Sequence, residues 1–348
     1  MATSSGWTPI HNQFHKTLLH RNLLPKNKRL LVAVSGGQDS LCLIKLLIDL
    51  QSKWGWNLAI IHCDHRWRTD SEANANYVQF LANTWDITYY QKTADVICKT
   101  EADARKWRYE VLGEIAINHN FNYVVTGHTA SDRAETLLYN LIRGSGSDGL
   151  GSLPWQRPLF ETGDIKGESP IPNPLLVRPL LEITRSQTLA FCQEQNLTIW
   201  EDSTNKDLHY NRNRIRAEII PLLRQFNPQV EINISQTAEL LKDEIDYLEK
   251  TAQEWRNKVL FVPVTDTENQ PEKTWGINRH LLREAPLAIQ RRVMRQILIE
   301  ILPIRPNFEH IEKMINLLRA PNRSQTDPFP GGAIAQVENP WIWIKREN

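Results

Sequence analysis

The sequence has no closely spaced pair of cysteines and no long uninterrupted apolar run. Its four cysteines are scattered, at Cys42, Cys63, Cys98 and Cys192. This pattern argues against a cysteine-held zinc or iron–sulfur site and suits the free thiols of a reducing compartment. Even the apolar segment Leu41–Leu50 is interrupted by Lys45, so we expect no membrane span. Because the start of the chain also lacks the apolar region of a secretory signal, we expect a cytoplasmic protein.

The sequence also has little net charge and neither of the two commonest phosphate-binding motifs. Lys and Arg number 41 against 40 Asp and Glu, which gives a formal net charge of +1 among 348 residues. A nucleic-acid partner must therefore be held by local basic patches rather than by a general positive charge. No GK[ST] follows the first glycine-rich loop, which excludes a Walker A motif, and no GxGxxG dinucleotide fingerprint is present.

The first half of the chain alternates short apolar runs with helical stretches. The runs predict buried strands of a parallel sheet, at Leu30–Val34, Leu58–His62, Ile87–Tyr90 and Tyr123–Thr126. The stretches between them predict helices, at Leu41–Leu50, Ser71–Trp85, Ala102–Asn118 and Ser131–Arg143. Repeated strand–helix units indicate an α/β fold with a doubly wound parallel sheet, whose ligand lies at the carboxyl ends of the strands.

The second half begins with two loop-like segments and then becomes helical. Gly144–Ser152 and Pro154–Pro174 predict loops, the second of them a surface excursion. Further helices are expected after an N-cap at Thr184 and at Ser235–Lys258, Leu287–Leu302 and Phe308–Leu318, before a hairpin that turns at Asn339-Pro340. We therefore expect a catalytic domain at 1–217, linker helices at 218–260 and a smaller, mainly helical domain at 261–348.

The segment SGGQDS, Ser35–Ser40, joins the first predicted strand to a helix. Gly36 and Gly37 bring bare backbone amides close to a ligand, and with the helix N-terminus they suit a phosphate. Asp39 would repel that phosphate unless a cation intervened, and Mg²⁺ commonly bridges a carboxylate and a phosphate. A tight strand-to-helix turn capped by Asp and Ser explains the same residues, so composition alone leaves both interpretations open.

This segment resembles the SGGxDS pyrophosphate loop of the N-type ATP pyrophosphatases. Four more segments resemble, in family order, motifs of the tRNA(Ile)-lysidine synthetases: HCDHRWR (His62–Arg68), EADARKWRY (Glu101–Tyr109), TGHTASDRAETLLYNLIRGSG (Thr126–Gly146) and WEDSTNKDLHYNRNRIR (Trp200–Arg216). Asp64 and Trp67 replace the family's Asn and Leu, and Ser131 replaces the first acid of an Asp pair. The acidic role expected there therefore passes to Asp132.

The resemblance implies a two-step reaction on RNA. ATP adenylates the C2 carbonyl oxygen of the wobble cytidine in a tRNA(Ile) with a CAU anticodon. The ε-amine of free L-lysine then attacks C2 and expels AMP, which leaves lysidine and changes decoding from AUG to AUA. ATP as substrate, Mg²⁺, this tRNA and L-lysine are thus the expected cofactors and partners, and a homodimer is left open.

The resemblance also implies roles for individual residues. Catalytic roles fall to Asp39, Arg105, His128, Asp132 and Glu135. ATP binding falls to Ser35, Gly36, Gly37, Gln38, Asp39, Ser40, His62 and Gly127, with Asp39 as the magnesium ligand. Asp132 and Glu135 share one helix face and are assigned to lysine binding or metal support, although a solvated face explains that spacing too. RNA contact falls to Asn211, Arg212, Arg214 and Arg216.

Several of these assignments compete with structural explanations. Arg105 and Arg108 suit phosphate contact, and surface pairing with Glu101 and Glu110 is the alternative; we favour a functional Arg105 and leave Arg108 open. Because the sequence has no paired cysteines, we expect His62 to line a nucleotide pocket rather than to hold zinc. In the second domain, a basic helix face opposite an apolar stripe suggests tRNA contact or simple solvation; its members are Arg291, Arg292 and Arg295.

Two other functions remain to be separated from a lysidine-forming ligase. A tRNA thiolase of the same class would use the same loop, but it needs reactive or cluster-bearing cysteines, which the dispersed cysteines here do not favour. A non-enzymatic, nucleotide-gated RNA-binding module is the second alternative. Asp39, His128 and Glu135 argue against it, because RNA binding alone needs no such cluster.

Overall fold

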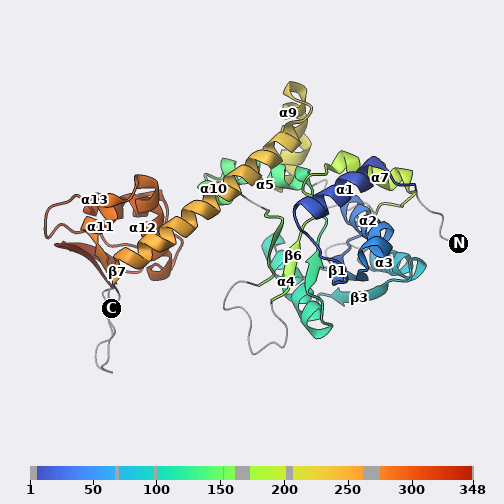
Figure 1. The fold of residues 1–348 in the computed structure, drawn as a ribbon, viewed down its shortest axis with the longest axis horizontal. Coiled ribbons are helices and arrows are strands. Elements are labelled where there is room, and N and C mark those ends of the chain that lie inside the picture. The colour runs from blue at the N-terminus through green and yellow to red at the C-terminus, as the bar shows by residue number, and fades with distance from the viewer. Residues whose placement is uncertain are drawn as a thin grey trace. The chain divides into compact units, whose positions relative to one another are not determined.

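The chain forms two compact units, which we describe separately (Figure 1). The computed structural model describes residues 6–66, 70–97, 100–151, 153–160, 173–200, 207–261 and 275–346. The first unit is Met1–Lys242 and the second is Asp243–Asn348. The boundary falls within helix α10 (Val230–Val259), inside the segment 218–260 that was expected to link two domains.

A six-stranded sheet organises the first unit. Its strands lie in the order β3-β2-β1-β4-β6-β5, with β1 at Arg29–Ala33, β2 at Asn57–Asp64, β3 at Thr88–Thr93, β4 at Tyr123–Val125, β5 at Gln156–Pro158 and β6 at Leu175–Val177. All neighbours are parallel except β5 and β6. The α/β fold and its four predicted strands are confirmed. Strands β5 and β6 were not predicted; the segment of β5 resembled a loop, and residues 161–172 lie outside the described part.

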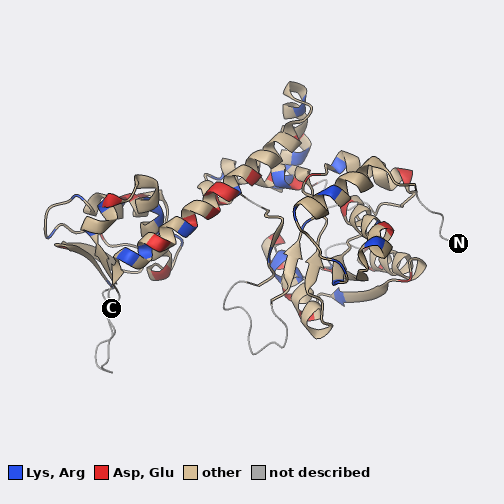
Figure 2. Cartoon of the chain, viewed as in Figure 1, with Lys and Arg blue, Asp and Glu red and all other residues tan. Residues whose placement is uncertain are grey.

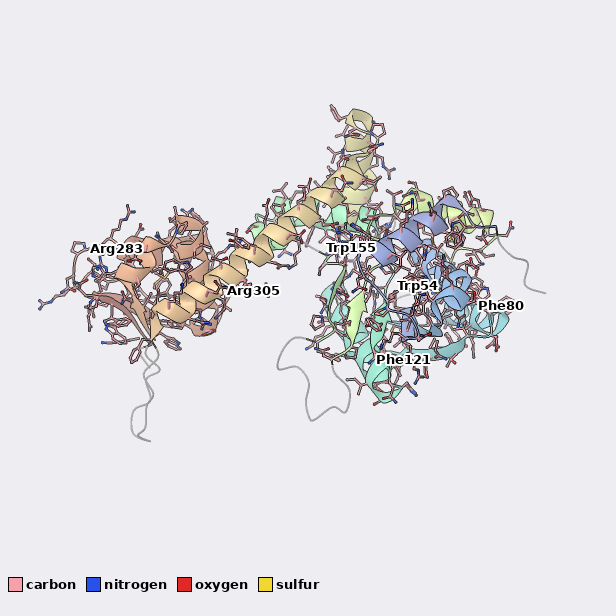
Figure 3. The ribbon with its side chains drawn as sticks, in the orientation of Figure 1. Trp54, Phe80, Phe121, Trp155, Arg283 and Arg305 are labelled. Atoms are coloured by element: carbon pink, nitrogen blue, oxygen red, sulfur yellow. The ribbon has the colours of Figure 1, made fainter. Side chains whose placement is uncertain are left out.

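Helices cover both faces of this sheet because alternate strand residues point to opposite sides. Leu30 and Val32 belong to the core shared with α1 (Pro9–His20), α2 (Gln38–Trp54), α3 (Ser71–Thr84) and α7 (Arg185–Glu194). Leu31 belongs to the core shared with α4 (Glu101–Asn118). Trp54 and Phe121, labelled in Figure 3, lie in these two separate cores. The sheet is therefore doubly wound, as predicted.

The strand order reverses between β1 and β4. From β1 the chain moves outward through β2 and β3, and it returns to the other side of β1 with β4. The carboxyl ends of β1 and β4 flank the switch point where α/β sheets bind ligands. The loop 34–37 leaves β1 there, and the loop 126–129, which precedes α5 (Ala130–Ile142), leaves β4. The loops of the SGGQDS and TGH motifs are thus neighbours in the fold.

Between α5 and the second unit the chain is mostly helical. A short helix, α6 (Ser147–Leu150), interrupts the predicted loop Gly144–Ser152, and α7 follows the predicted cap at Thr184. The end of the last quoted motif, RNRIR at Arg212–Arg216, is called the RNxIR segment. It begins in α8 (Asn211–Arg214) and enters a π-helical turn at Ile215–Ile219, after which the helix continues as α9 (Ile220–Phe226). The EDSTNK segment before it, residues 201–206, lies outside the described residues, as does Trp67.

The second unit combines helices with an antiparallel sheet. Its strands lie in the order β7-β8-β10-β9, with bounds Leu260–Phe261, Trp275–Asn278, Trp341–Arg346 and Ala333–Glu338. The predicted hairpin is confirmed as β9 and β10, and it belongs to a larger sheet than the sequence indicated. Helices α11 (Arg279–Glu284), α12 (Leu287–Ile301) and α13 (Phe308–Leu317) accompany it, and α12 buries the predicted stripe with Ile289, Val293 and Ile297. Among the described residues, no helix has the length and apolar character needed to cross a bilayer.

Candidate functional site

The loop between β1 and α2 is shaped to receive an anion. Gly36 has φ = +86°, a conformation that side chains other than hydrogen rarely adopt. A Cβ there would collide with Oδ1 of Asn74. Gly37 is the N-cap of α2 and offers no side-chain acceptor to the first amides of the helix. Those amides, at the positive end of the helix, therefore stay available to a phosphate.

Neighbouring side chains fix the backbone of this loop. Ser40 Oγ accepts from the Ser35 amide at 3.1 Å and donates to the Gly37 carbonyl at 2.9 Å. Asn74 Nδ2 donates to the Ser35 carbonyl at 3.0 Å, and the Trp200 amide donates to the Gly36 carbonyl at 3.0 Å. The loop is thus held open from several sides before any ligand binds.

Two residues assigned to ATP binding have other contacts here. His62 is buried, and its Nδ1 donates to the Val34 carbonyl at 2.8 Å, where β1 gives way to the loop. Gln38 directs its side-chain amide to α7, with Nε2 donating to the Arg185 carbonyl at 2.8 Å. Both side chains therefore support the loop, and their contact with nucleotide stays a prediction.

The second loop touches the first through Gly127. A Cβ on Gly127 would lie 2.9 Å from the carbonyl of Asp39, so only glycine permits this approach. His128 follows it and is hydrogen-bonded to Thr126 Oγ1 at 3.0 Å. Burial, reinforced by the positive charge of Arg178, lowers the pKa of His128 to about 3. His128 is therefore neutral near pH 7 and is suited to hydrogen bonding rather than to charge pairing.

Three predicted acids converge on one arginine that the sequence did not single out. Arg185 Nη2 lies 2.8 Å from Asp132 Oδ1, its Nε lies 3.1 Å from Asp39 Oδ2, and its Nη1 lies 3.6 Å from Glu135 Oε1. Arg185 is the first residue of α7, placed there by the cap at Thr184, whose Oγ1 accepts from the Gln187 amide. We call Asp39, Asp132, Glu135 and Arg185 the acidic cluster.

The acids of this cluster have different affinities for protons. Burial raises the pKa of Asp39 to about 6, even though Arg185 and a hydrogen bond from Thr188 act in the opposite direction. Burial also acts upward on Asp132, but Arg185, His128 and the amide of Thr129 together lower its pKa to about 2. Asp132 is thus ionised near pH 7, whereas Asp39 is protonated more readily when the pH falls.

Glu135 connects the acidic cluster to the RNxIR segment. Its buried carboxylate accepts from Arg216 Nε and Nη2, both at 2.8 Å, in a two-point pair. Three carboxylates therefore face two guanidinium groups, those of Arg185 and Arg216. Counting Arg216 together with the four residues of the acidic cluster, one negative charge is left over, which favours the binding of one more cation.

The other residues assigned to RNA lie at the surface or in ion pairs. Asn211 is exposed, Arg212 pairs with Glu101 at 3.5 Å, and Arg214 pairs with Glu218 at 3.0 Å. In the second unit, Arg292 and Arg295 of α12 both contact Glu249 of α10, and Arg291 contacts Glu312 of α13 at 2.7 Å. Figure 2 shows the same mixture of both signs along α10. These acids weaken the basic face of α12, so its RNA contact stays a prediction.

Arg105 lies on α4, with its guanidinium carbon 5.0 Å from the centroid of the Tyr109 ring. The expected surface alternative does not describe it, because Glu101 pairs with Arg212 and Glu110 lies 4.0 Å from Lys106. Arg108 Nη2 instead lies 2.9 Å from Nε2 of His65. Arg105 thus forms no ion pair with any acid that the structure describes, and its contact to phosphate stays a prediction.

The residues around Asp39 suit a magnesium ion that arrives with its nucleotide. The described residues contain no group of three or more His, Cys, Asp or Glu side chains placed to hold a metal. Mg²⁺ commonly needs only one or two carboxylates, because substrate phosphates and water complete its shell. Asp39 meets this requirement, and Asn74 adds a buried Oδ1 without a hydrogen-bond partner in the described structure.

Sequence reasoning missed Arg185, Thr188 and Asn74. Each acts on the loop or on Asp39 from an element distant in the chain, and none belongs to a quoted motif. The cap at Thr184 was the only available signal, since it predicted a helix that begins at Arg185. It gave no indication of where that helix would lie.

Comparison with known proteins agrees with this arrangement. A family model described as the PP-loop domain matches residues 8–223. A tRNA(Ile)-lysidine synthase from Nostoc sp. is 60% identical over 344 residues, covering 97% of each chain. One from Synechocystis sp. is 49% identical over 338 residues, covering 97% of this chain and 98% of that one.

A solved structure gives independent support for the fold. The U34-tRNA thiolase NcsA from Methanococcus maripaludis, determined with its [4Fe-4S] cluster, matches with a TM-score of 0.55 and 17% identity. The match covers 67% of this chain and 77% of that chain. Of the cysteines in this chain, Cys42, Cys63 and Cys192 are free thiols.

Proposed function

Because the chain belongs to the tRNA(Ile)-lysidine synthase family, we propose that the glycine loop and the acidic cluster carry out the two steps of lysidine formation. Membership makes the chain a ligase that forms a carbon–nitrogen bond on tRNA(Ile), with ATP as a substrate. What we add is the assignment of each step to particular residues. Lysine as the amine donor, Mg²⁺, cytoplasmic location and a homodimer stay predictions.

The glycine loop serves the first step, in which the cytidine C2 oxygen attacks the α-phosphate of ATP. The bond to pyrophosphate breaks as the new phosphate ester forms. The open amides at the start of α2 neutralise charge on the departing pyrophosphate. Asp39 would hold Mg²⁺, which would supply further neutralisation of the phosphate charge. Removal of Asp39 therefore weakens the first step more than it weakens RNA binding.

The acidic cluster serves the second step by holding L-lysine. The negative charge left over among Asp39, Asp132, Glu135, Arg185 and Arg216 favours one further cation, and the ε-ammonium of lysine meets that need. The bound amine must then lose a proton, which costs about 4.6 kcal/mol at pH 7 for a pKa of about 10.4. The neutral amine attacks C2, and the oxygen leaves with AMP. The convergence of the three acids beside the glycine loop is the observation that carries this proposal.

A substitution at Asp39 tests the proposal. The variant Asp39→Asn keeps the size of the side chain but removes the charge that favours magnesium. We expect it to release little pyrophosphate in the presence of ATP, Mg²⁺, L-lysine and tRNA(Ile), while it binds the tRNA nearly as well as the wild type. Asp49→Asn is the matched control, because Asp49 lies on the same helix and pairs with Lys45 and His11 away from the loop.

Mass spectrometry of the tRNA identifies the product. Labelled lysine should appear in the anticodon of the wild-type reaction and be absent with Asp39→Asn. Pyrophosphate release that continues at the wild-type rate in Asp39→Asn would remove this residue from the mechanism. A wild-type enzyme that incorporates no lysine, but thiolates the tRNA when a sulfur donor is added, would favour the thiolase alternative.

A further inference from the structure

Three arginines surround the ring of Tyr109 on the first unit. The guanidinium carbons of Arg105 and Arg157 lie 5.0 and 5.1 Å from the ring centroid. Arg178 lies close enough to Tyr109 that each shifts the pKa of the other. They come from separate elements, because Arg105 and Tyr109 lie on α4, Arg157 lies in β5, and Arg178 directly follows β6. We call these four residues the arginine cluster.

This cluster is positively charged, and the described part of the chain places no acid in it. Among the described residues, no carboxylate forms an ion pair with Arg105, Arg157 or Arg178. Burial, together with the charges of Arg157 and Arg105, lowers the pKa of Arg178 to about 10. Burial acts upward on the pKa of Tyr109, but the arginines lower it. Both shifts have the sign expected where positive charges crowd together.

The lack of a partner anion is most unfavourable for the charge of Arg178, because this side chain is buried. Its side chain is 1% exposed, Nη1 donates to the Pro154 carbonyl at 2.9 Å, and Nε has no hydrogen-bond partner within the described structure. Arginine does not relieve such burial by losing its proton at ordinary pH. An unpaired buried charge is unfavourable unless an anion or further hydrogen bonds compensate it. The cluster is therefore suited to an anion from outside the protein.

The position of the cluster in the sheet indicates which anion. Along the carboxyl edge, the glycine loop follows β1, His128 follows β4, and Arg178 follows β6. Strands β1 and β6 are separated by β4, and adjacent strands lie about 4.8 Å apart. Measured across the strands, Arg178 is therefore about 10 Å from the glycine loop. It lies close enough to His128 to lower its pKa. The triphosphate already has the loop amides, and this second basic site lies on the far side of His128.

We propose that the arginine cluster binds one backbone phosphate of the RNA beside the reacting cytidine. This inference rests on the proposed function, since it assumes that the RNA enters at the carboxyl edge. A phosphodiester offers two anionic oxygens to the planar guanidinium groups, which suit such paired contacts. The cluster thereby positions the RNA chain, and the chemistry stays with the loop and the acidic cluster.

The dependence of tRNA affinity on salt tests this site without turnover. Dissociation constants for tRNA(Ile) are measured over a range of salt concentration, without ATP or lysine, for the wild type and for Arg157→Gln and Arg105→Gln. Each phosphate contact to single-stranded nucleic acid contributes about 0.7 to the slope of log K against log salt. We expect each variant to bind more weakly and to lose about 0.7 from that slope. Tyr109→Phe, which keeps the ring and removes the hydroxyl, should leave the slope close to that of the wild type.

Arg29→Gln is the matched control. The Arg29 guanidinium lies 4.8 Å from the centroid of Phe121, but Arg29 begins β1, at the opposite edge of the sheet. Its slope should equal that of the wild type. ATP affinity, measured separately without RNA, should be unchanged in Arg157→Gln.

Each contrary outcome has a distinct meaning. An unchanged salt slope with weakened ATP binding would assign the cluster to the nucleotide and overturn the inference. Unchanged slope and unchanged ATP affinity would make it a structural feature, which also overturns the inference. In both cases a wild type that still forms lysidine leaves the proposed function standing, so the two failures are distinguishable.

Discussion

Replacing Arg185 by Gln tests the acidic cluster most directly, because one guanidinium group faces three carboxylates. Two contacts lie at 2.8 and 3.1 Å and a third at 3.6 Å. Removal of one partner from a buried ion pair destabilises a protein by about 3–5 kcal/mol, since the remaining charge keeps its desolvation cost. We expect a loss of this size, because Glu135 retains Arg216 whereas Asp39 and Asp132 lose their only arginine among the described residues.

The assay is thermal unfolding of the first unit within the full chain. For a domain of this size, 1 kcal/mol corresponds to about 2–4 °C, so the melting temperature should fall by about 6–20 °C. Arg214→Gln is the control, because Arg214 pairs only with Glu218 in an exposed contact among the described residues. Surface pairs of this kind contribute about 0–1 kcal/mol, which predicts a small change.

Added L-lysine separates a site for ammonium from a merely structural pair. Because removal of Arg185 increases the surplus negative charge from one to two, lysine should raise the melting temperature of Arg185→Gln more than that of the wild type, by the usual linkage of binding to stability. Norleucine, which lacks the ε-amine, should have no such effect. A variant that melts like the wild type, or a smaller lysine effect in the variant, would refute the reasoning.

Two further predictions concern the loops. Gly36→Ala places a Cβ against Asn74 Oδ1 at φ = +86°, so the variant should fold but lose ATP binding, which equilibrium titration with a fluorescent ATP analogue measures. Retained affinity would show that the loop geometry is not needed. His128→Gln removes a group whose pKa is about 3 when folded and 6.5 when unfolded. Because the unfolded chain binds the extra proton between these values, His128 contributes stability that is present above pH 6.5 and lost as the pH falls toward 3. The difference in unfolding free energy between the wild type and this variant should therefore shrink by up to about 1.4 kcal/mol per pH unit on acidification, as measured by urea unfolding. The difference is the quantity to compare, since the raised pKa of Asp39 acts with the opposite sign between about pH 6 and 4.

The sequence was informative wherever local pattern determines structure. Apolar runs located β1 to β4, and the Thr184 cap located the start of α7. It was uninformative where partners lie far apart in the chain. Arg185 is separated from Asp132 by 53 positions, and their contact becomes visible only when α7 packs beside α2. The basic face of α12 shows the converse, because its pattern gave no indication that Glu249 would neutralise it.

The first unit separates charge along one edge of its sheet, and the reaction gives a physical reason for this. Among the described residues, carboxylates with a surplus negative charge lie around Arg185, and arginines without acidic partners lie around Tyr109. His128 lies within electrostatic reach of both groups and is itself neutral. A ligase that joins a cationic amine to a polyanionic RNA must hold opposite charges at adjacent positions without letting them pair. If the acidic cluster and the arginine cluster were in direct contact, their charges would neutralise each other. Neither cluster would then favour the binding of a charged substrate. The neutral imidazole of His128 neutralises neither the acidic cluster nor the arginine cluster, so each can bind its own substrate. A positively charged residue at position 128 should therefore weaken the binding of lysine while it leaves the binding of RNA intact.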